Sequence, residues 1–377
     1  MSDDTDDIDN KDDEIAARVL AAPDDAGVRI ACADALVRRG DPRGQLAALQ
    51  LEIDRIAAAG DSSRLRALRT REARLVREHG AAWLRGLELH PHEVRFRGGF
   101  VEEVAITAAG LPRLATAARR TPLRVLRVNG VDGASARALA DLAAPHLRAL
   151  DLRGACLDRA ALAALAAQPR PLHALRLRLA ALDEDAAALL AAMAPRLAEL
   201  HVRFERATPA GARAVALAFP QLTTLALLKD RLRAPVAGSL GPGGAAALSS
   251  APLAQLERLD LRGNELGDAG ALALAHAHLP ALRTLDLAAR YAHRSDVAAI
   301  DRGDNHIGAP GAAALVERLA PRTLRLAGNP LGDAGARALH ELDRVDELRL
   351  LDLRDCGISR GEQRRLEVRR WKTQLLL

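Results

Sequence analysis

The chain has 377 residues, which is more than one hydrophobic core usually holds, so its length indicates either two domains or an elongated array of repeats. Hydrophobic residues make up 49% of the chain but aromatic residues only 2%, which favours an interior of many thin layers of Leu, Ala and Val. The formal net charge is +5, and the three cysteines, which lack C-x-x-C spacing, argue against a disulfide framework or a zinc site and favour a reducing cytoplasm.

Residues 1–12 are predicted to be a disordered acidic tail. The first fourteen residues hold eight acids against a single lysine, a composition that buries too little apolar surface to fold. Because this start is acidic and no apolar run of about 18 residues follows, we expect neither a secretory signal nor a membrane span. The expected location is the cytoplasm.

Residues 13–88 are predicted to form a small all-α module. Apolar residues recur there at steps of three or four, as in Ile15 with Val19 and Leu46 with Leu49. Turn-forming residues at 23–25 and 40–44 divide the apolar segments, which indicates four short helices.

Several residues of this module match a known bacterial pattern: Pro23, Asp24, Asp25, Arg29, Ala33, Asp34, Leu36, Gly40, Asp41, Pro42, Arg43, Gly44 and Gln50. The pattern resembles the repeat-companion domain, which stands in front of repeat arrays in large-genome bacteria. The family tends to carry Trp at the place of Ala35. The resemblance implies a bacterial protein in which the module precedes repeats, and it implies no activity.

Residues 94–359 contain a repeated segment of the form L-x-x-L-x-L. The second leucine of each copy recurs at intervals of 24, 25, 25, 25, 34, 26, 39 and 27 residues, at Leu126, Leu150, Leu175, Leu200, Leu225, Leu259, Leu285, Leu324 and Leu351. Val101, Val104 and Ile106 form an earlier, degenerate copy. Such spacing is typical of leucine-rich repeats.

Within each copy the leucines alternate at period two and then change to helical spacing, as from Leu259 to Leu274, so a short strand precedes a helix. The pattern predicts an α/β fold, a right-handed leucine-rich-repeat solenoid or horseshoe with parallel strands on its concave side and helices on its convex side. The repeats resemble the ribonuclease-inhibitor-like subtype. In that arrangement Asn264, Asn305 and Asn329 stand where a side-chain amide binds the backbone of the turn, and Cys356 takes the same place as a structural residue and not a nucleophile.

Two intervals are long because they contain insertions near 233–243 and 288–304. The second insertion carries Arg290, Tyr291, His293 and Arg294, which make it a secondary candidate for a binding loop. Insertions in repeat arrays are either functional loops or tolerated decoration, and the sequence leaves both readings open. Residues 360–377 are predicted to form a C-terminal capping helix.

The residues between the inward leucines project onto the concave sheet. Neighbouring strands place several arginines there, so the like charges of Arg153, Arg178 and Arg203 would repel by about 1 to 3 kcal/mol per pair unless acids such as Asp151 compensate. A face that neutralises itself is one interpretation, and an anion-binding face of exposed, replaceable guanidinium groups is the other. The candidate partner-binding residues are Arg127, Arg153, Arg176, Arg178, Arg203 and Arg262.

We expect a protein–protein interaction scaffold that binds an acidic or phosphorylated partner on this face, and not an enzyme. The sequence contains no Walker, dinucleotide, G-x-S-x-G or H-E-x-x-H motif, so it predicts no catalytic residue, metal or cofactor. One alternative is a regulator of a nucleotide hydrolase, because the repeat subtype also resembles Ran GTPase-activating proteins. The other is nucleic-acid binding, which the scarcity of aromatic side chains for base stacking disfavours.

Overall fold

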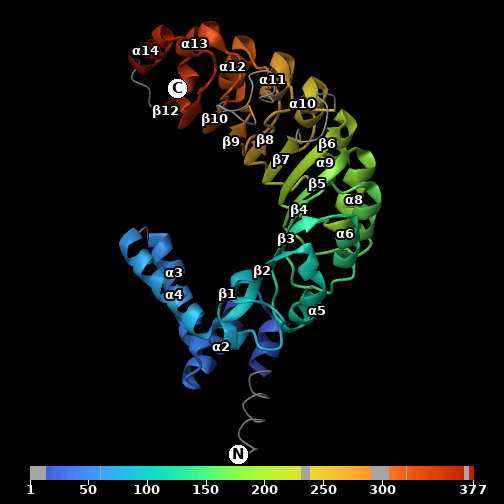
Figure 1. Cartoon of the computed structure of the whole chain (residues 1–377). Coiled ribbons are helices and arrows are strands. Elements are labelled where there is room, and N and C mark those ends of the chain that lie inside the picture. Colours follow the sequence, from blue (N-terminus) through green and yellow to red (C-terminus); the bar gives the residue numbers. More distant parts are fainter. Residues whose placement is uncertain (1–13, 60, 231–237, 290–304, 320, 369–372) are drawn as a thin grey trace, which may run out of the picture. The chain divides into compact units, whose positions relative to one another are not determined.

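The computed structural model describes residues 14–59, 61–230, 238–289, 305–319, 321–368 and 373–377 (Figure 1). The chain divides into two compact units, Met1–Arg153 and Gly154–Leu377, so the helical module and the first repeats belong to the same unit. The predicted tail and the loop candidates Arg290, Tyr291, His293 and Arg294 lie outside the described residues.

The first unit opens with the predicted helical module. A helix over residues 14–21 is followed by α2 (Ala26–Arg38), α3 (Pro42–Ala59) and α4 (Ser62–Trp83). Ile15 and Val19 face the same side of the first helix and are buried against α2, and Ala35 and Phe100 pack on this cluster. The helical periodicity therefore predicted the module, although α3 and α4 are longer than expected.

The strands of the first unit begin with an antiparallel pair, β1 (Val94–Arg97) and β2 (Phe100–Thr107). From β2 onward the pairing is parallel, and Val104 lies opposite Leu126 of β3 (Val125–Val131). The degenerate first copy predicted from the sequence is thus β2. The unit also contains α5 (Leu111–Arg120) and α6 (Gly133–Ala140), and it ends within β4 (Ala149–Gly154).

Side chains of the helical module bind the strands of the same unit. Arg29 pairs with Glu102 of β2, while Arg124 pairs with Asp24 and donates to the carbonyl oxygen of Pro23 at 2.9 Å. Gln50 donates to the carbonyl of Phe96 at 2.8 Å and accepts from the amide of Gly98 at 2.7 Å.

The two carboxylates at this contact have pKa values that are shifted in opposite directions. Burial raises the pKa of Glu102 despite the nearby guanidinium groups of Arg29 and Arg124. For Asp24 burial acts in the same direction, but hydrogen bonds from Arg124 and Arg148 outweigh it and hold its pKa below the usual value. Three residues that carry the resemblance noted from the sequence thus attach the module to the strands: Gln50 binds β1, Arg29 binds β2, and Asp24 binds Arg124 just before β3.

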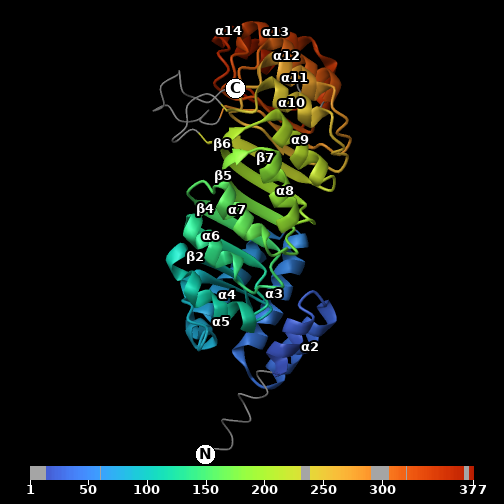
Figure 2. The same cartoon turned by 90° about the vertical axis from the view of Figure 1, so that its right-hand side faces the viewer.

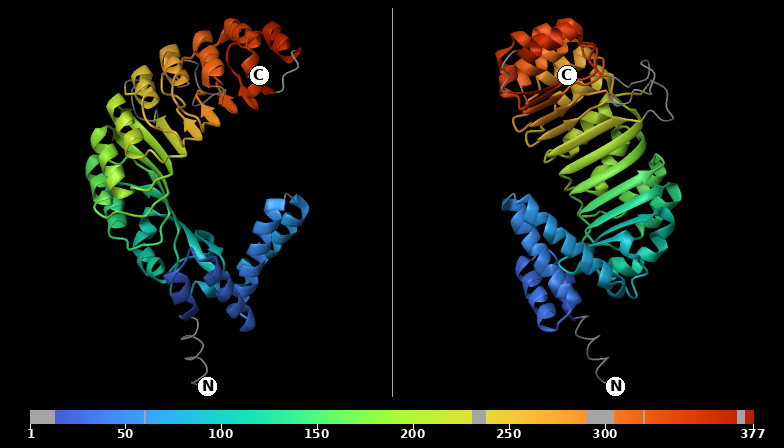
Figure 3. Two further views of the ribbon diagram at one scale, coloured as in Figure 1. Left: turned by 180° about the vertical axis from the view of Figure 1, so that it is seen from behind. Right: turned by 60° about the vertical axis from the view of Figure 1, so that its left-hand side comes forward.

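The second unit is a stack of strand–helix repeats in which neighbouring strands pair in parallel. Its strands lie on the inner side of a curved stack, and its helices lie on the outer side (Figures 2 and 3). Figure 2 is viewed from the helical side. The nine leucines that set the predicted register are all 3% exposed or less, so the fold is a leucine-rich-repeat solenoid as predicted. Its strands and helices are α7 (Arg159–Ala166), β5 (Ala174–Leu182), α8 (Glu184–Met193), β6 (Glu199–Ala207), α9 (Pro209–Ala218), β7 (Thr224–Lys229), α10 (Gly241–Ser249), β8 (Arg258–Asp260), α11 (Gly267–Ala275), β9 (Thr284–Asp286), α12 (Ala309–Ala314), β10 (Thr323–Arg325), α13 (Gly332–Glu341), β11 (Leu350–Asp352), α14 (Arg360–Val368) and β12 (Gln374–Leu376).

The predicted asparagine ladder determines where the strands end. Asn264, Asn305 and Asn329 are buried, and each amide nitrogen donates to two backbone carbonyls. The strands of these repeats are 3 residues long, whereas β5 and β6, whose repeats lack the asparagine, are 9 residues long. The side-chain amide takes over backbone groups that would otherwise continue the strand pairing.

A glycine near the start of α9 allows this helix to approach the preceding repeat. A Cβ atom at Gly211 would lie 2.3 Å from the carbonyl oxygen of Leu182 and 2.6 Å from the Cα of Asp183, and neither backbone atom can move independently. Gly211→Ala is therefore expected to lower the free energy of unfolding by about 1–3 kcal/mol through overpacking. Gly133→Ala, also in a helix but with no atom within 4 Å, is the control and should leave stability unchanged or slightly raised. Chemical denaturation of both variants makes the comparison, and equal stabilities would contradict the close approach.

The C-terminus differs from the prediction of a capping helix alone. Helix α14 is followed by β12, whose Leu375 lies opposite Leu351 of β11. A strand of 3 residues, Gln374–Leu376, is too short to be identified from sequence. Among the described helices, none combines the length and apolar character needed to cross a bilayer.

Candidate functional site

The strand face of the second unit carries the columns of side chains predicted from the sequence. Cα pairing places Arg176 beside His201 and Ala226, and the same row continues through Asp260, Asp286, Arg325 and Asp352. A second row contains Arg178, Arg203 and Leu228. The predicted register is confirmed at these positions of the two rows.

Arg178 is not a freely exposed side chain. Its guanidinium pairs with Asp230 and donates to the carbonyl oxygen of Gly154 at 2.6 Å. The exposed fraction of the side chain is 26% for Arg178 and 3% for Asp230. The expectation that Arg178 is freely exposed is therefore wrong, and we expect its replacement to destabilise the fold, because the substitution would leave the Asp230 carboxylate buried without this partner.

The surroundings of Arg178 contain further polar groups at the ends of β5, β6 and β7. Lys229 is fully buried and donates through Nζ to the carbonyl oxygen of Glu205. Burial, reinforced by a hydrogen bond with Glu205, raises the pKa of Cys156 to about 11, so its thiol stays protonated near neutral pH. Cys156 is thus a poor nucleophile.

Arg262 belongs to a ladder of aspartate and arginine side chains on the next strands. It binds Asp260 through Nε at 2.9 Å and Nη2 at 2.7 Å, and its Nε lies 3.6 Å from Asp286. The Asp260 hydrogen bond raises the pKa of Arg262. Asp286 also lies 3.5 Å from Arg325, and Arg354 binds Asp352 at 2.6 Å. This part of the face neutralises its own charge.

Of the exposed arginines in the two rows, Arg325 lies beside Asp286, and the other two are Arg176 and Arg203. Both have interaction partners within the protein. Arg176 and Arg203 lie diagonally across two neighbouring strands, about 8 Å apart at the backbone, so their long side chains allow both guanidinium groups to reach the same ligand. Arg178 lies directly beside Arg203 in the register and is held in place by its own ion pair.

The two remaining candidates, Arg127 and Arg153, are on strands of the first unit. Arg127 pairs with Glu103 at 2.8 Å, and Arg153 pairs with Asp151 at 2.8 Å. The hydrogen bond to Asp151 raises the pKa of Arg153. Asp151 thus compensates Arg153, as the sequence suggested.

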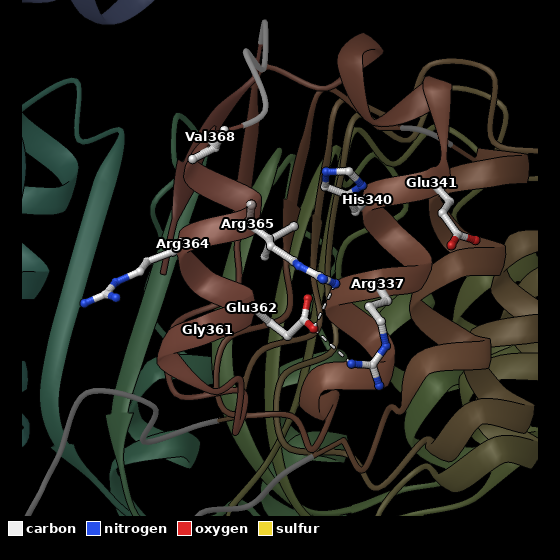
Figure 4. Close-up of a pocket in the computed structure, with 9 residues that line it drawn as sticks. Arg337, His340, Glu341, Gly361, Glu362, Arg364, Arg365 and Val368 are labelled. Carbon is white, nitrogen blue, oxygen red and sulfur yellow. Dashed lines mark hydrogen bonds and ion pairs between the residues drawn. The ribbon is translucent and has the colours of Figure 1, made fainter.

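A groove of about 610 Å³ lies between α13 and α14 (Figure 4). Glu362 accepts hydrogen bonds from Arg337 at 3.0 Å and Arg365 at 3.4 Å, so its carboxylate is neutralised between the two helices. Val368 at the rim is 82% exposed. The ion pairs identify the groove as the contact between the last two helices of the stack.

Sequence reasoning missed that Asp230 holds Arg178 in place. Asp230 occupies the position taken by Asn264 in the later repeat, and an acid in that column beside the arginine row was the available signal. Cys356 was placed correctly: its Sγ lies 3.2 Å from the carbonyl oxygen of Leu326, and burial raises its pKa to about 12.

Among the described residues, no three His, Cys, Asp or Glu side chains come together as a set that could hold a metal.

Comparisons with known proteins agree with the repeat pattern. A family model described as Leucine Rich repeat matches residues 255–275 and 322–339. No curated protein matches the chain significantly. Among solved structures, the chain is similar to one in the yeast structure titled "Crystal structure of Rad7 and Elc1 complex", with 17% sequence identity, coverage of 68% of this chain and 69% of that chain, and a TM-score of 0.37. The spacing, the fold and the family model together identify leucine-rich repeats in this chain.

Proposed function

We propose that the protein is an interaction scaffold whose second unit binds an acidic or phosphorylated protein on its strand face. The observation that carries this proposal is the exposed pair Arg176 and Arg203 on adjacent strands β5 and β6, beside Arg178. Guanidinium groups bind carboxylate and phosphate through two parallel hydrogen bonds. A rigid parallel sheet holds such groups at fixed spacing, as repeat proteins commonly do in binding.

The ion pairs of Arg178 and Arg262 support binding in a second way. Both side chains are fixed by carboxylates of the protein, Asp230 and Asp260, so they lose little conformational freedom when a ligand arrives. The same carboxylates reduce the net positive potential. We therefore expect an affinity that depends less on salt than four isolated arginines would give.

The test compares a partner's affinity for the native protein and for Arg176→Ala/Arg203→Ala. A partner is first captured from a lysate of the native host, identified by mass spectrometry and purified, and its dissociation constant is then measured by calorimetry. The double variant should bind about 2 kcal/mol more weakly, roughly a 30-fold loss, if the two guanidinium groups are central contacts.

A control removes the same charge from the helical side of the second unit, through Arg213→Ala/Arg318→Ala. Arg213 is an exposed residue of α9. The identified partner of Arg318 is His276, which is itself exposed. This variant should keep the native affinity. Equal losses in both variants would mean that net charge attracts the partner, and no loss in the first would remove the strand face as the binding site.

A further inference from the structure

Helix α4 of the first unit exposes a row of arginines that the proposed scaffold function does not use. Arg66, Arg69 and Arg77 are exposed and fall within roughly 80° of the helix circumference at 3.6 residues per turn. A groove of about 460 Å³ runs along them, lined also by Ser62, Leu65, Thr70 and Ala73. We call Arg66, Arg69 and Arg77 the α4 stripe.

None of the three arginines of the α4 stripe forms an ion pair with another described residue, and the charge of Arg77 acts on Glu78 only as a minor contribution beside Arg74. Of the two acids on the helix, Glu72 accepts from Gln50 and Glu78 pairs with Arg74. On α3, Glu52 pairs with Arg64 and Asp54 pairs with Arg97. Like charges three residues apart destabilise a helix slightly, so folding does not explain the stripe.

The stripe is also accessible. Trp83, at the C-terminal end of α4, packs edge-on against Phe96 of β1, with ring centres 5.2 Å apart. From there the α3–α4 hairpin projects away from β1 and β2 of the same unit (Figure 3). The rise of 1.5 Å per residue makes the stripe about 17 Å long from Arg66 to Arg77.

The chemistry of the stripe fits a nucleic-acid backbone better than a protein. The core of a protein interface is enriched in aromatic residues and Met as well as Arg, whereas the arginines of the α4 stripe are flanked by Ser62, Leu65, Thr70 and Ala73, with no aromatic residue or Met among them. Nucleic-acid interfaces are much more positive, and Arg binds phosphate through its planar fork.

A duplex fits better than a single strand. Single-strand sites rely on aromatic side chains that stack on bases, and the α4 stripe has none. A duplex carries one charge per roughly 1.7 Å of its axis, so a straight row of about 17 Å faces several phosphates. We propose that the α4 stripe binds the phosphate backbone of a double-stranded nucleic acid without reading its sequence.

The experiment measures binding of the full chain to a labelled DNA duplex of about 20 base pairs by fluorescence anisotropy at several salt concentrations. The stripe variant is Arg66→Gln/Arg69→Gln/Arg77→Gln. Its affinity should fall at least tenfold, and the slope of log K against log salt should become less negative by about 2.7, which is 0.9 for each of three phosphate contacts.

The matched control is Arg64→Gln/Arg74→Gln/Arg97→Gln, which removes the same three charges from the same unit. Each of these arginines already has an acidic partner, so the control should keep most of the affinity and the native salt slope. Equal losses in the two variants would overturn the proposal in favour of a diffuse attraction. If circular dichroism shows that the stripe variant is unfolded, Arg66→Lys/Arg69→Lys/Arg77→Lys replaces it. This second variant keeps the three charges and should therefore retain the native salt slope. Loss of that slope would overturn the proposal.

Two further probes separate the classes of ligand. A duplex RNA should bind through the same stripe, because the contacts are to phosphates. A polyglutamate peptide of equal charge should bind much more weakly than the DNA duplex. If it binds as tightly and is equally sensitive to the stripe variant, the surface recognises acidic protein segments and the assignment to nucleic acid is wrong.

Discussion

Arg178→Ala is expected to lower the free energy of unfolding by about 3–5 kcal/mol, the usual cost of removing one partner from a buried ion pair. The Asp230 carboxylate, 3% exposed, would lose its guanidinium partner in a place where water cannot replace it. The carbonyl of Gly154 would lose its hydrogen bond at the same time. Equilibrium denaturation in urea measures the difference.

Two further variants test whether the ion pair itself is responsible. Arg178→Met/Asp230→Leu removes both charges and should return to within about 1 kcal/mol of the native stability, because apolar replacement of a buried pair is often neutral. Arg213→Ala, at an exposed site on α9, should change stability by no more than about 0.5 kcal/mol. A loss below about 1 kcal/mol for Arg178→Ala would show that Asp230 remains solvated.

This expectation changes how the strand face can be probed. A substitution at Arg178 would lower stability as well as affinity, so a measured loss of binding would have two causes. Arg176 and Arg203 are exposed and are therefore better suited to a binding test. The sequence alone ranked these arginines equally, because alternation along a strand says only which face a residue occupies. The ion pair with Asp230 distinguishes them.

The repeat register could be predicted because it depends on local spacing that recurs many times. Leu175, Leu200 and Leu225 occupy equivalent positions, and burial of one face fixes the strand register, so Arg176 falls beside His201 as expected. The asparagine ladder was predictable for the same reason. At that place in the repeat, an asparagine amide has few roles other than binding the backbone of the turn.

Contacts that depend on three-dimensional proximity could not be predicted in this way. Arg178 and Asp230 are 52 residues apart, and Arg124 and Asp24 are 100 apart, and neither pair recurs in other repeats. The α4 stripe was missed for a different reason. The arginines were visible in the sequence, but only the structure shows that Glu72 and Glu78 are engaged elsewhere.

Asn305→Ala is expected to destabilise the second unit by about 1–3 kcal/mol, because the buried backbone nitrogen of Asn264 would lose its acceptor. The carbonyls of Leu261 and Leu287, in contrast, keep the amides of Asn264 and Asn329 as donors. The Asn305 amide oxygen accepts from the backbone nitrogen of Asn264 at 2.8 Å. Its nitrogen donates to the carbonyls of Leu261 at 3.0 Å and Leu287 at 2.9 Å. One side chain thus connects its own repeat to the preceding one.

The position of Cys356 suggests a variant of intermediate effect. Its Sγ already approaches one carbonyl at the equivalent place in the last repeat, so Asn305→Cys should retain part of the ladder and lose less stability than Asn305→Ala. Asn129→Ala is the control, because Asn129 is exposed at the end of β3 and should tolerate the change within about 0.5 kcal/mol. Thermal and urea denaturation of the three variants should give this order of stability. If Asn305→Ala were as stable as Asn129→Ala, water would have to reach the backbone nitrogen of Asn264, and the amide ladder would not be what holds adjacent repeats together.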